Sequence, residues 1–154
     1  MSHTERLKKA VSQHQIGQLD SAETLYRQVL SEKPNDADAL HMLGLLSYQK
    51  GKPELAEDLI SRSLEIDPDF PPAMMNLGNA LLATKDFSRT EKLFRHAVTD
   101  RNSKTDAMLG LAISLFWQER HDDAIECLDR LLEIEPKNAT ALFQAGQSCA
   151  SSTR

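Results

Sequence analysis

The sequence predicts an all-α fold built from helix-turn-helix repeats, and three observations carry this prediction. Residue types recur along the chain with a period of 34 residues. Within each period, apolar residues recur at three- and four-residue spacing, which is the periodicity of a helix with one buried face. No long stretch alternates between apolar and polar residues, so we expect no strands.

Five alignment columns define the repeat. The first holds only small residues, namely Ala10, Gly44, Gly78, Ala112 and Gly146. The second is alanine with one exception, in Ala22, Ala56, Thr90 and Ala124. Two columns are apolar, namely Tyr26, Ile60, Phe94 and Leu128, and Leu30, Leu64, Val98 and Leu132. The last column marks where each repeat ends, at Pro34, Pro68, Asn102 and Pro136.

The repeats therefore run over residues 3–36, 37–70, 71–104 and 105–138, followed by a partial repeat over 139–154. A chain of 154 residues is long enough to bury a core, and we expect a single domain over 1–154. The partial repeat becomes polar near its end. We expect it either to form a closing helix or to be the point at which a longer protein was cut.

Each complete repeat divides into two helices at a break, which we place at Gly17, Gly51, Lys85 and Arg120. The second helix of the second repeat is expected from Pro53 to Ile66, because proline suits the first helical position. Asp86 is expected to cap the equivalent helix of the third repeat, and Asp122 or Asp123 that of the fourth. We expect caps for the following first helices at Asn35, Asp69 and Ser103.

Glycine inside a predicted helix needs a reason, because it costs about 1 kcal/mol relative to alanine. Gly78 lies in such a helix, within the stretch "MMNLGNAL". The period places it in the column of small residues, where neighbouring helices would cross closely. Close packing along a stack of repeats then offsets the loss of helix propensity.

Composition excludes several classes of protein. The net charge of −5 argues against broad nucleic-acid binding, which requires a basic face. No apolar run is long enough for a membrane span, and the N-terminal "MSHTERLKKA" lacks the apolar core of a secretory signal. Cys127 and Cys149 do not form a disulfide framework. A cytoplasmic location is therefore expected.

The pattern resembles the tetratricopeptide repeat family, whose signature spans 34 residues. The second repeat matches it at Leu40, Leu43, Gly44, Ser47, Ala56, Ile60, Ser63 and Pro68. The fourth repeat matches at Met108, Leu111, Ala112, Leu115, Ala124, Leu128, Leu131 and Pro136. The resemblance implies a right-handed α-solenoid that binds proteins through a concave groove. Arg6 and Lys9 stand where apolar residues belong, which suits an exposed end of the solenoid.

The family places its groove on one stripe of each first helix, and the resemblance assigns this stripe by register. The residues predicted to bind a partner there are His41, Leu45, Tyr48, Met75, Asn76, Asn79, Leu109, Ile113 and Phe116. The amides of Asn76 and Asn79 would offer hydrogen bonds to a peptide, and the apolar side chains would anchor it. Two alternatives stay open: the asparagines are merely solvated, and aromatic residues such as Phe116 and Trp117 belong to the core.

The resemblance also allows two more specific groove functions to be weighed. "NLGN" is similar to the asparagine ladder of O-linked N-acetylglucosamine transferases, but the neighbouring rungs hold Met42, Gly110 and Gln144. Chaperone-docking members bind a C-terminal carboxylate with lysine, asparagine and arginine side chains, and of that set only Asn76 is present here. Asp106 would repel a carboxylate, so we expect a neutral or basic partner rather than an acidic one.

No residue pattern predicts an enzyme, a metal site or a cofactor. The cluster "ERHDD" at 119–123 places a histidine beside carboxylates, but at a turn where capping explains them. Cys127 and Cys149 have no histidine at catalytic spacing and are interpreted as structural. Lys8 belongs to a small basic tip that is interpreted as solvated.

The sequence thus predicts a non-enzymatic protein-interaction module, an adaptor or scaffold. The alternative is an N-terminal regulatory or substrate-recruiting segment of a larger bacterial transferase-like enzyme, of glycosyltransferase or sulfotransferase type. The stretch "ADALHMLGLLSYQKGKPELAEDLI" resembles leaders of such enzymes and motivates this hypothesis. Self-association through an end of the solenoid is a third option.

Overall fold

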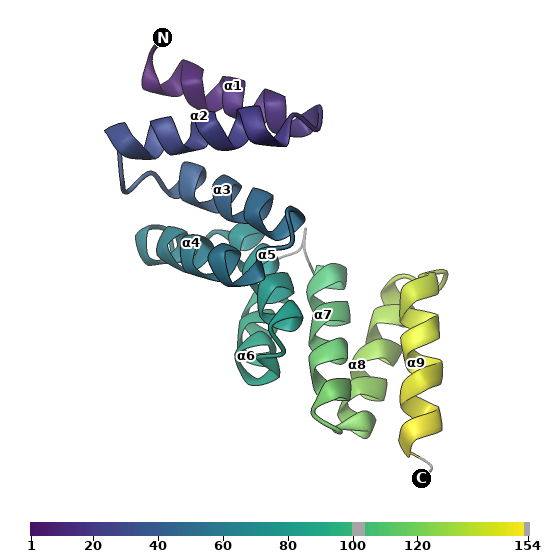
Figure 1. The fold of residues 1–154 in the computed structure, drawn as a ribbon. Coiled ribbons are helices and arrows are strands. Elements are labelled where there is room, and N and C mark those ends of the chain that lie inside the picture. Colours follow the sequence, from purple (N-terminus) through teal and green to yellow (C-terminus); the bar gives the residue numbers. More distant parts are fainter. Residues whose placement is uncertain (100–103, 153–154) are drawn as a thin grey trace. The chain divides into compact units, whose positions relative to one another are not determined.

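The computed structural model describes residues 1–99 and 104–152, which form nine α-helices and no strand (Figure 1). The helices are α1 (His3–Gln15), α2 (Leu19–Glu32), α3 (Ala37–Gln49), α4 (Pro53–Ile66), α5 (Pro71–Ala83), α6 (Phe87–Ala97), α7 (Lys104–Trp117), α8 (His121–Ile134) and α9 (Ala139–Ser152). The predicted all-α class is confirmed. The chain divides into two compact units, Met1–Ala80 and Leu81–Arg154, which are described separately.

The helices begin largely where the sequence places them. The predicted bounds of α4 are confirmed, with Pro53 in its first turn, and Asp86 caps α6 by accepting a hydrogen bond from the Arg89 amide at 3.1 Å. The cap of α3 is Asp36 rather than Asn35, because the Asp36 carboxylate accepts from the Ala39 amide at 2.9 Å.

The predicted cap of α8 is wrong. Arg120 occupies its N-cap position without a capping bond, and Asp122 and Asp123 lie inside the first turn. There their negative charges interact favourably with the positive end of the helix dipole instead. The predicted landmarks Asn102 and Ser103 lie outside the described residues.

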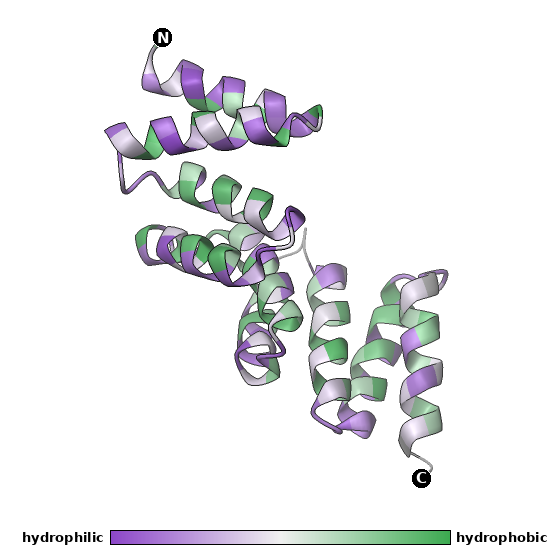
Figure 2. Ribbon diagram, in the orientation of Figure 1, coloured by the Kyte–Doolittle hydropathy of each residue, from purple (hydrophilic) through white to green (hydrophobic). Residues whose placement is uncertain are grey.

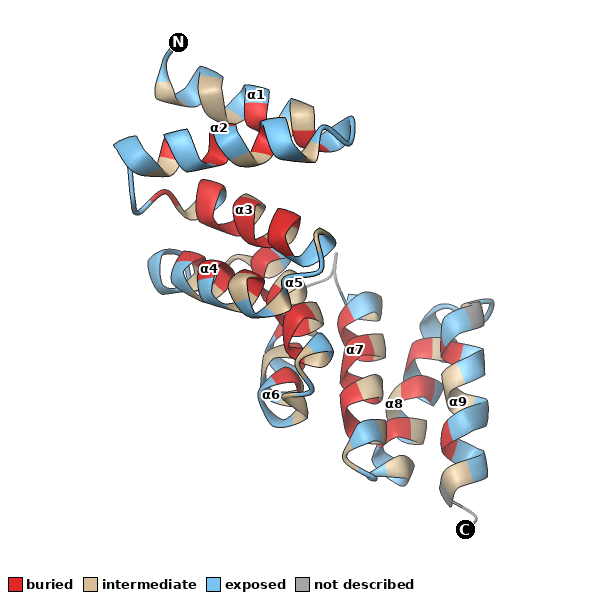
Figure 3. Cartoon of the chain, viewed as in Figure 1, coloured by how far each residue is buried: buried red, intermediate tan, exposed pale blue. Residues whose placement is uncertain are grey.

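In the first unit, the core lies between the facing stripes of α1, α2, α3 and α4, where buried leucines and alanines meet (Figures 2 and 3). Gly44 of α3 faces Ile60 of α4. A Cβ atom on Gly44 would lie 3.2 Å from the Ile60 Cδ1 and 3.3 Å from the Ala56 carbonyl oxygen, and closer still to the Ile60 Cγ1. The small-residue column is therefore explained here by the close approach of the two helices of one repeat.

In the second unit, α7 packs between α6 and α8, and α9 packs against α8. Buried residues of α7, α8 and α9 form one cluster that includes Met108, Leu128 and Ala141. Gly110, which the family register places on the groove stripe, is instead buried against Phe94 of α6. A Cβ atom on Gly110 would lie 2.5 Å from the Phe94 Cζ and 2.8 Å from its Cδ2.

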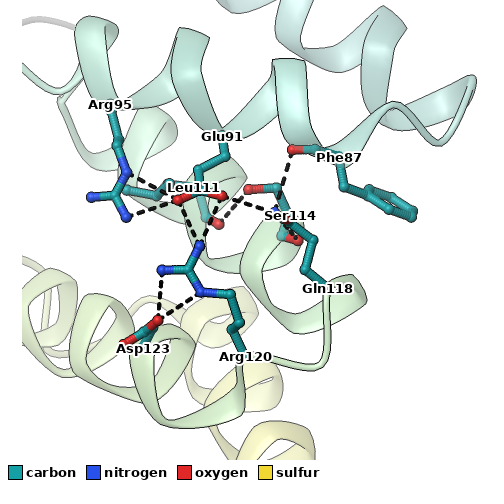
Figure 4. A network of polar contacts seen from close by, with 8 residues as sticks. All are labelled: Phe87, Glu91, Arg95, Leu111, Ser114, Gln118, Arg120 and Asp123. Carbon is teal, nitrogen blue, oxygen red and sulfur yellow. Dashed lines mark hydrogen bonds and ion pairs between the residues drawn. The ribbon is translucent and has the colours of Figure 1, made fainter.

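A carboxylate ties successive repeats together in the second unit (Figure 4). Glu91 of α6 accepts hydrogen bonds from Arg95 at 2.9 Å, from Gln118 at 3.0 Å and from Arg120 at 2.8 Å. Burial acts to raise the pKa of Glu91, but these three hydrogen bonds act to lower it, and the net pKa lies below the usual value. Arg120 also reaches Asp123 at 2.7 Å, so the same side chain joins the start of α8 to Glu91 of α6.

The first unit has a carboxylate in the same register. Glu23 of α2 lies 68 residues before Glu91, two repeat lengths away. It accepts from Lys50 at the end of α3 at 2.7 Å and from Arg27 at 2.9 Å. Hydrogen bonds from Lys50 and Arg27 lower the pKa of Glu23. Lys50 also binds Asp20 at 2.8 Å, so one lysine here replaces the glutamine and arginine of the second unit.

A candidate protein-binding pocket

A pocket of about 420 Å³ opens in the first unit between α1 and α3. Its walls are mainly apolar, with polar groups from both helices. The lining residues are Leu7, Lys8, Val11, Ser12, Gln15, Asp38, His41, Met42 and Phe70. Its volume lies within the roughly 300–1,000 Å³ typical of ligand pockets.

Two opposite charges lie at this pocket. Lys8 comes from α1 and Asp38 from α3, and both residues are exposed. An exposed charge of this kind can pair with a charge on a partner, although such a pair typically contributes only about 0–1 kcal/mol. The pocket therefore offers an apolar cavity with one cation and one anion beside it.

His41 forms a buried polar wall of the pocket. It is only 5% exposed, and its Nε2 lies 2.8 Å from the Asn76 Nδ2. Since an amide nitrogen donates, the neutral imidazole accepts this bond at Nε2. Burial lowers the pKa of His41, an effect that the nearby Asp38 charge partly opposes. The ring also meets Phe70 edge-on, with centroids 4.8 Å apart.

Asn76 therefore has a specific partner. The prediction has this amide bind a peptide; in the structure the side chain is half-buried and its Nδ2 donates to His41. The pair connects α3 to α5 within the first unit and fixes the orientation of the imidazole in the pocket wall. Sequence register placed both residues on the groove stripe, but it could not show that they bind each other.

The other predicted groove residues of the first unit lie outside the pocket lining. Tyr48 is 37% exposed. The remaining three are half-buried, namely Leu45, Met75 and Asn79. Among the nine predicted residues, the structure therefore brings His41 into the pocket and Asn76 against it, and leaves these four beyond its walls.

The three predicted residues of the second unit share one degree of burial. Leu109, Ile113 and Phe116 are half-buried, and Leu109 packs against the core cluster of that unit. The Phe116 ring lies 5.6 Å from that of Trp117, centroid to centroid. Trp117 is 61% exposed and stacks on Phe87 at a centroid distance of 6.1 Å. The suggestion that Trp117 belongs to the core is wrong.

Sequence reasoning missed the α1 side of the pocket. Lys8 was interpreted as part of a solvated tip, and Leu7 and Val11 were not singled out. A signal was present, because Leu7 and Lys8 lie one repeat length before His41 and Met42. Extending the groove register into the first repeat would have found them.

The described part of the chain contains neither a cluster of metal ligands nor an activated cysteine. Over residues 1–99 and 104–152, no three metal-binding side chains lie close enough to hold an ion. Burial raises the pKa of the Cys127 thiol, which makes it a poorer nucleophile, and its Sγ donates to the Met108 carbonyl at 3.3 Å. None of the helices in these residues has the length and apolar character needed to cross a membrane.

Comparison with known proteins agrees with the fold. The family model described as tetratricopeptide repeat matches residues 13–77 and 81–147. Human tetratricopeptide repeat protein 7A is 30% identical over 110 residues, which are 71% of this chain and 13% of that protein. The human protein O-mannosyl-transferase TMTC1 is 25% identical over 129 residues, which are 84% of this chain and 14% of that protein. The chain thus spans about a seventh of these curated relatives.

Solved structures share the architecture at low sequence identity. A crystal structure of MamA superposes with a TM-score of 0.89 at 22% identity, covering 98% of this chain and 82% of the other. YrrB, described as a TPR protein with an unusual peptide-binding site, superposes with a TM-score of 0.87 at 20% identity. That match covers 96% of this chain and 76% of YrrB. At these identities the likeness establishes the fold alone.

Proposed function

Since this chain belongs to the tetratricopeptide repeat family, we propose that it is a protein-interaction module that anchors a peptide or helix segment in the pocket between α1 and α3. The observation that carries the proposal is the pocket itself, a cavity of about 420 Å³ whose surface is mostly apolar. Apolar anchors in such cavities supply most of the binding energy at protein interfaces. The peptide-binding site in the description of YrrB supports the same class of function.

The chemistry of the walls specifies the anchor. Leu7, Val11, Met42 and Phe70 favour a large apolar side chain. Lys8 and Asp38 lie close enough to orient the polar groups on either side of that anchor. The half-exposed Tyr48 and the half-buried Asn79 would extend the contact beyond the pocket. A neutral or basic partner suits the net charge of −5 better than an acidic one.

The test fills the pocket without removing any core residue. Ser12 lines the pocket and is exposed, so Ser12→Trp should occupy the cavity while leaving the fold intact. Lys9→Trp places the same bulk at an exposed position of α1 outside the lining. Circular dichroism would check that both variants fold like the wild type.

Partners captured from a lysate of the source cells would be identified by mass spectrometry. Titration of the captured segment would then measure its affinity. We expect Ser12→Trp to weaken binding by at least about tenfold and Lys9→Trp to leave it unchanged. Equal retention of the partner by both variants would contradict the proposal.

A second candidate function is recruitment within a larger transferase. The observation that favours it is the match to an O-mannosyl-transferase, of which this chain covers 14%. In that case the pocket would hold the substrate protein of a catalytic domain on the same polypeptide. An epitope tag inserted at the exposed Gly17 turn in the native gene would report the size of the product on a blot. A product of 154 residues would count against this candidate.

A further inference from the structure

His41 brings an unused hydrogen-bond donor to the pocket between α1 and α3. Its imidazole is neutral above pH 7, because burial lowers its pKa from the usual 6.5. Nε2 accepts from the Asn76 amide at 2.8 Å, so the single ring proton is on Nδ1. Within residues 1–99 and 104–152, the His41 ring makes this one hydrogen bond, and its Nδ1–H group makes none.

This Nδ1–H group faces the pocket. His41 is only 5% exposed, and it lines the pocket. Among the described residues, its Nδ1 is not one of the unpaired atoms that are sealed from solvent. The small accessible part of the side chain therefore belongs to the pocket wall. A ligand that covers this wall must supply an acceptor, because a buried donor without a partner is costly.

The neighbouring charges determine what kind of acceptor fits. Asp38 lies one turn before His41 on the same face of α3, and its exposed carboxylate also lines the pocket. The Asp38 charge acts to raise the pKa of His41, whereas Lys8 on α1 has no such effect. An anionic group at His41 would thus be repelled by Asp38 more than it is attracted by Lys8. The polar end of the anchor is therefore neutral.

Building on the binding function proposed above, we propose that the anchor is a tyrosine of a neutral or basic segment, whose hydroxyl accepts from the His41 Nδ1–H and donates to Asp38. Among side chains with a large apolar body, phenylalanine and leucine have no acceptor. Tryptophan only donates, and methionine accepts weakly. Tyrosine combines an apolar ring with a hydroxyl that both accepts and donates.

The apolar walls suit the ring of such an anchor. Leu7 and Val11 contribute from α1, Met42 from α3, and Phe70 from the segment before α5. The Phe70 ring already meets His41 edge-on, with centroids 4.8 Å apart. A bound phenol ring would add further aromatic contacts, which are favourable in edge-on and offset geometries. The walls bind the ring, and the two polar groups read its hydroxyl.

Asn76 is a positioning residue in this arrangement. Its amide donates to Nε2 and so keeps the ring proton on Nδ1, where the anchor needs a donor. Without this bond the proton could move to Nε2, and Nδ1 would become an acceptor. The half-buried Asn76 therefore contributes to specificity through His41 rather than by touching the partner.

The test compares two probes that differ by one hydroxyl group. N-acetyl-tyrosine amide and N-acetyl-phenylalanine amide are titrated separately into the intact, ¹⁵N-labelled chain at pH 7.5. NMR spectra follow the ring nitrogens of His41 and the amides of the pocket residues. Asp38→Ala removes the carboxylate, and Asp106→Ala is the matched control, since Asp106 is exposed at the equivalent position of α7. Ser12→Trp fills the pocket and should abolish binding of both probes.

We expect the free chain to carry the ring proton on Nδ1, and the tyrosine probe to bind at least about fivefold more tightly than the phenylalanine probe. Asp38→Ala should bring the two affinities closer together, and Asp106→Ala should leave their ratio unchanged. A proton on Nε2 in the free chain, or equal binding of both probes, would overturn the tyrosine assignment while leaving an apolar binding pocket in place. If neither probe shifts a pocket residue at about 20 mM, the proposed binding function fails as well.

A second copy of this chain is the other occupant that the spectra would reveal. Tyr26 is buried, so a second copy could offer Tyr48, which is 37% exposed. In that case the His41 signals would shift with protein concentration in the absence of any probe, and Tyr48→Phe would remove the shift. That result would overturn the assignment of the pocket to a different partner.

Discussion

The two units differ in which glycine lies against one particular apolar position of the repeat. In the first unit, Ile60 of α4 covers Gly44 within its own repeat. In the second unit, Phe94 of α6 presses its ring against Gly110 of the next repeat. Both residues follow from one 34-residue period, yet the larger aromatic ring reaches across to the following helix. The same repeat position therefore lies against a glycine in both units, of its own repeat in the first and of the following repeat in the second.

The turns inside the repeats differ in a parallel way. Gly17 and Gly51 adopt φ angles of +78° and +74° in the first unit. The equivalent residues of the second unit are Lys85 and Glu119, at +64° and +61°. Glycine adopts this left-handed conformation without strain, whereas a side chain makes it less favourable. The second unit thus keeps the turn at some cost in stability.

The largest expected effect concerns the buried glycines. Gly110→Ala would force a methyl group against the Phe94 ring and should destabilise the second unit by about 1–3 kcal/mol. Gly44→Ala should cost less, because the Ile60 side chain can change rotamer while an aromatic ring cannot shrink. Urea unfolding followed by circular dichroism measures both. Gly146→Ala is the matched control and should stabilise by about 0.5–1 kcal/mol, since that position is exposed. An equal loss of stability in Gly110→Ala and Gly44→Ala would contradict the expected difference between the two glycines.

The next largest effects concern the carboxylates of Glu91 and Glu23. Glu91→Gln removes the charge that binds Arg95 and Arg120 and should cost about 1 kcal/mol. Glu23→Gln should cost a similar amount, because Lys50 and Arg27 lose the same carboxylate. Since both folded pKa values lie below the usual 4.5, each contribution is complete above pH 4.5 and is lost as pH falls through the folded pKa. Hydrogen exchange would show which unit loses stability in each variant. A loss of protection in both units would contradict the expectation that each carboxylate stabilises only its own unit.

A pH effect should distinguish the units further. The folded pKa of His41 lies below its usual value of 6.5, so its neutral form stabilises the first unit fully above pH 6.5. That contribution is lost as pH falls below 6.5 and through the folded pKa. Leu109 occupies the equivalent position of the second unit and cannot titrate. We expect amide exchange in the first unit to accelerate between about pH 6.5 and 5, beyond the intrinsic dependence, and His41→Gln to remove that change. An unchanged profile in His41→Gln would rule out this residue as the cause.

The smallest expected effect is a gain. Lys85→Gly or Glu119→Gly should stabilise the second unit by about 0.5–1 kcal/mol. This gain is the backbone strain that glycine relieves at a positive φ angle, minus the conformational entropy that glycine loses on folding. Gly51→Ala is the reverse change in the first unit and should destabilise by about 1 kcal/mol. Thermal unfolding of the three variants measures the signs. A loss with Lys85→Gly would mean that the lysine side chain stabilises the turn more than its strain costs.

The sequence anticipated the repeating elements well because their causes are local. Pro53 begins α4 and Asp86 caps α6, since a fixed φ angle and a short acceptor act within a few residues. The Asp122 and Asp123 prediction failed because an acidic residue stabilises either a cap or a first turn, and the sequence does not distinguish them. The candidate site was half anticipated: register identified His41 and Asn76, but their mutual hydrogen bond depends on how α3 and α5 approach each other.

By itself, the sequence determined the period, the helix pairs, the all-α class and the family, because helix periodicity, turn residues and small-residue columns are properties of neighbours along the chain. Only the tertiary structure decided that α1 and α3 leave a pocket, that Phe94 fills its space at Gly110, and that Gly146 of α9 has nothing over it. These features depend on side-chain size and on the distance between helices far apart in sequence. A repeat pattern records which positions face a neighbour, and packing decides whether a neighbour fills the space.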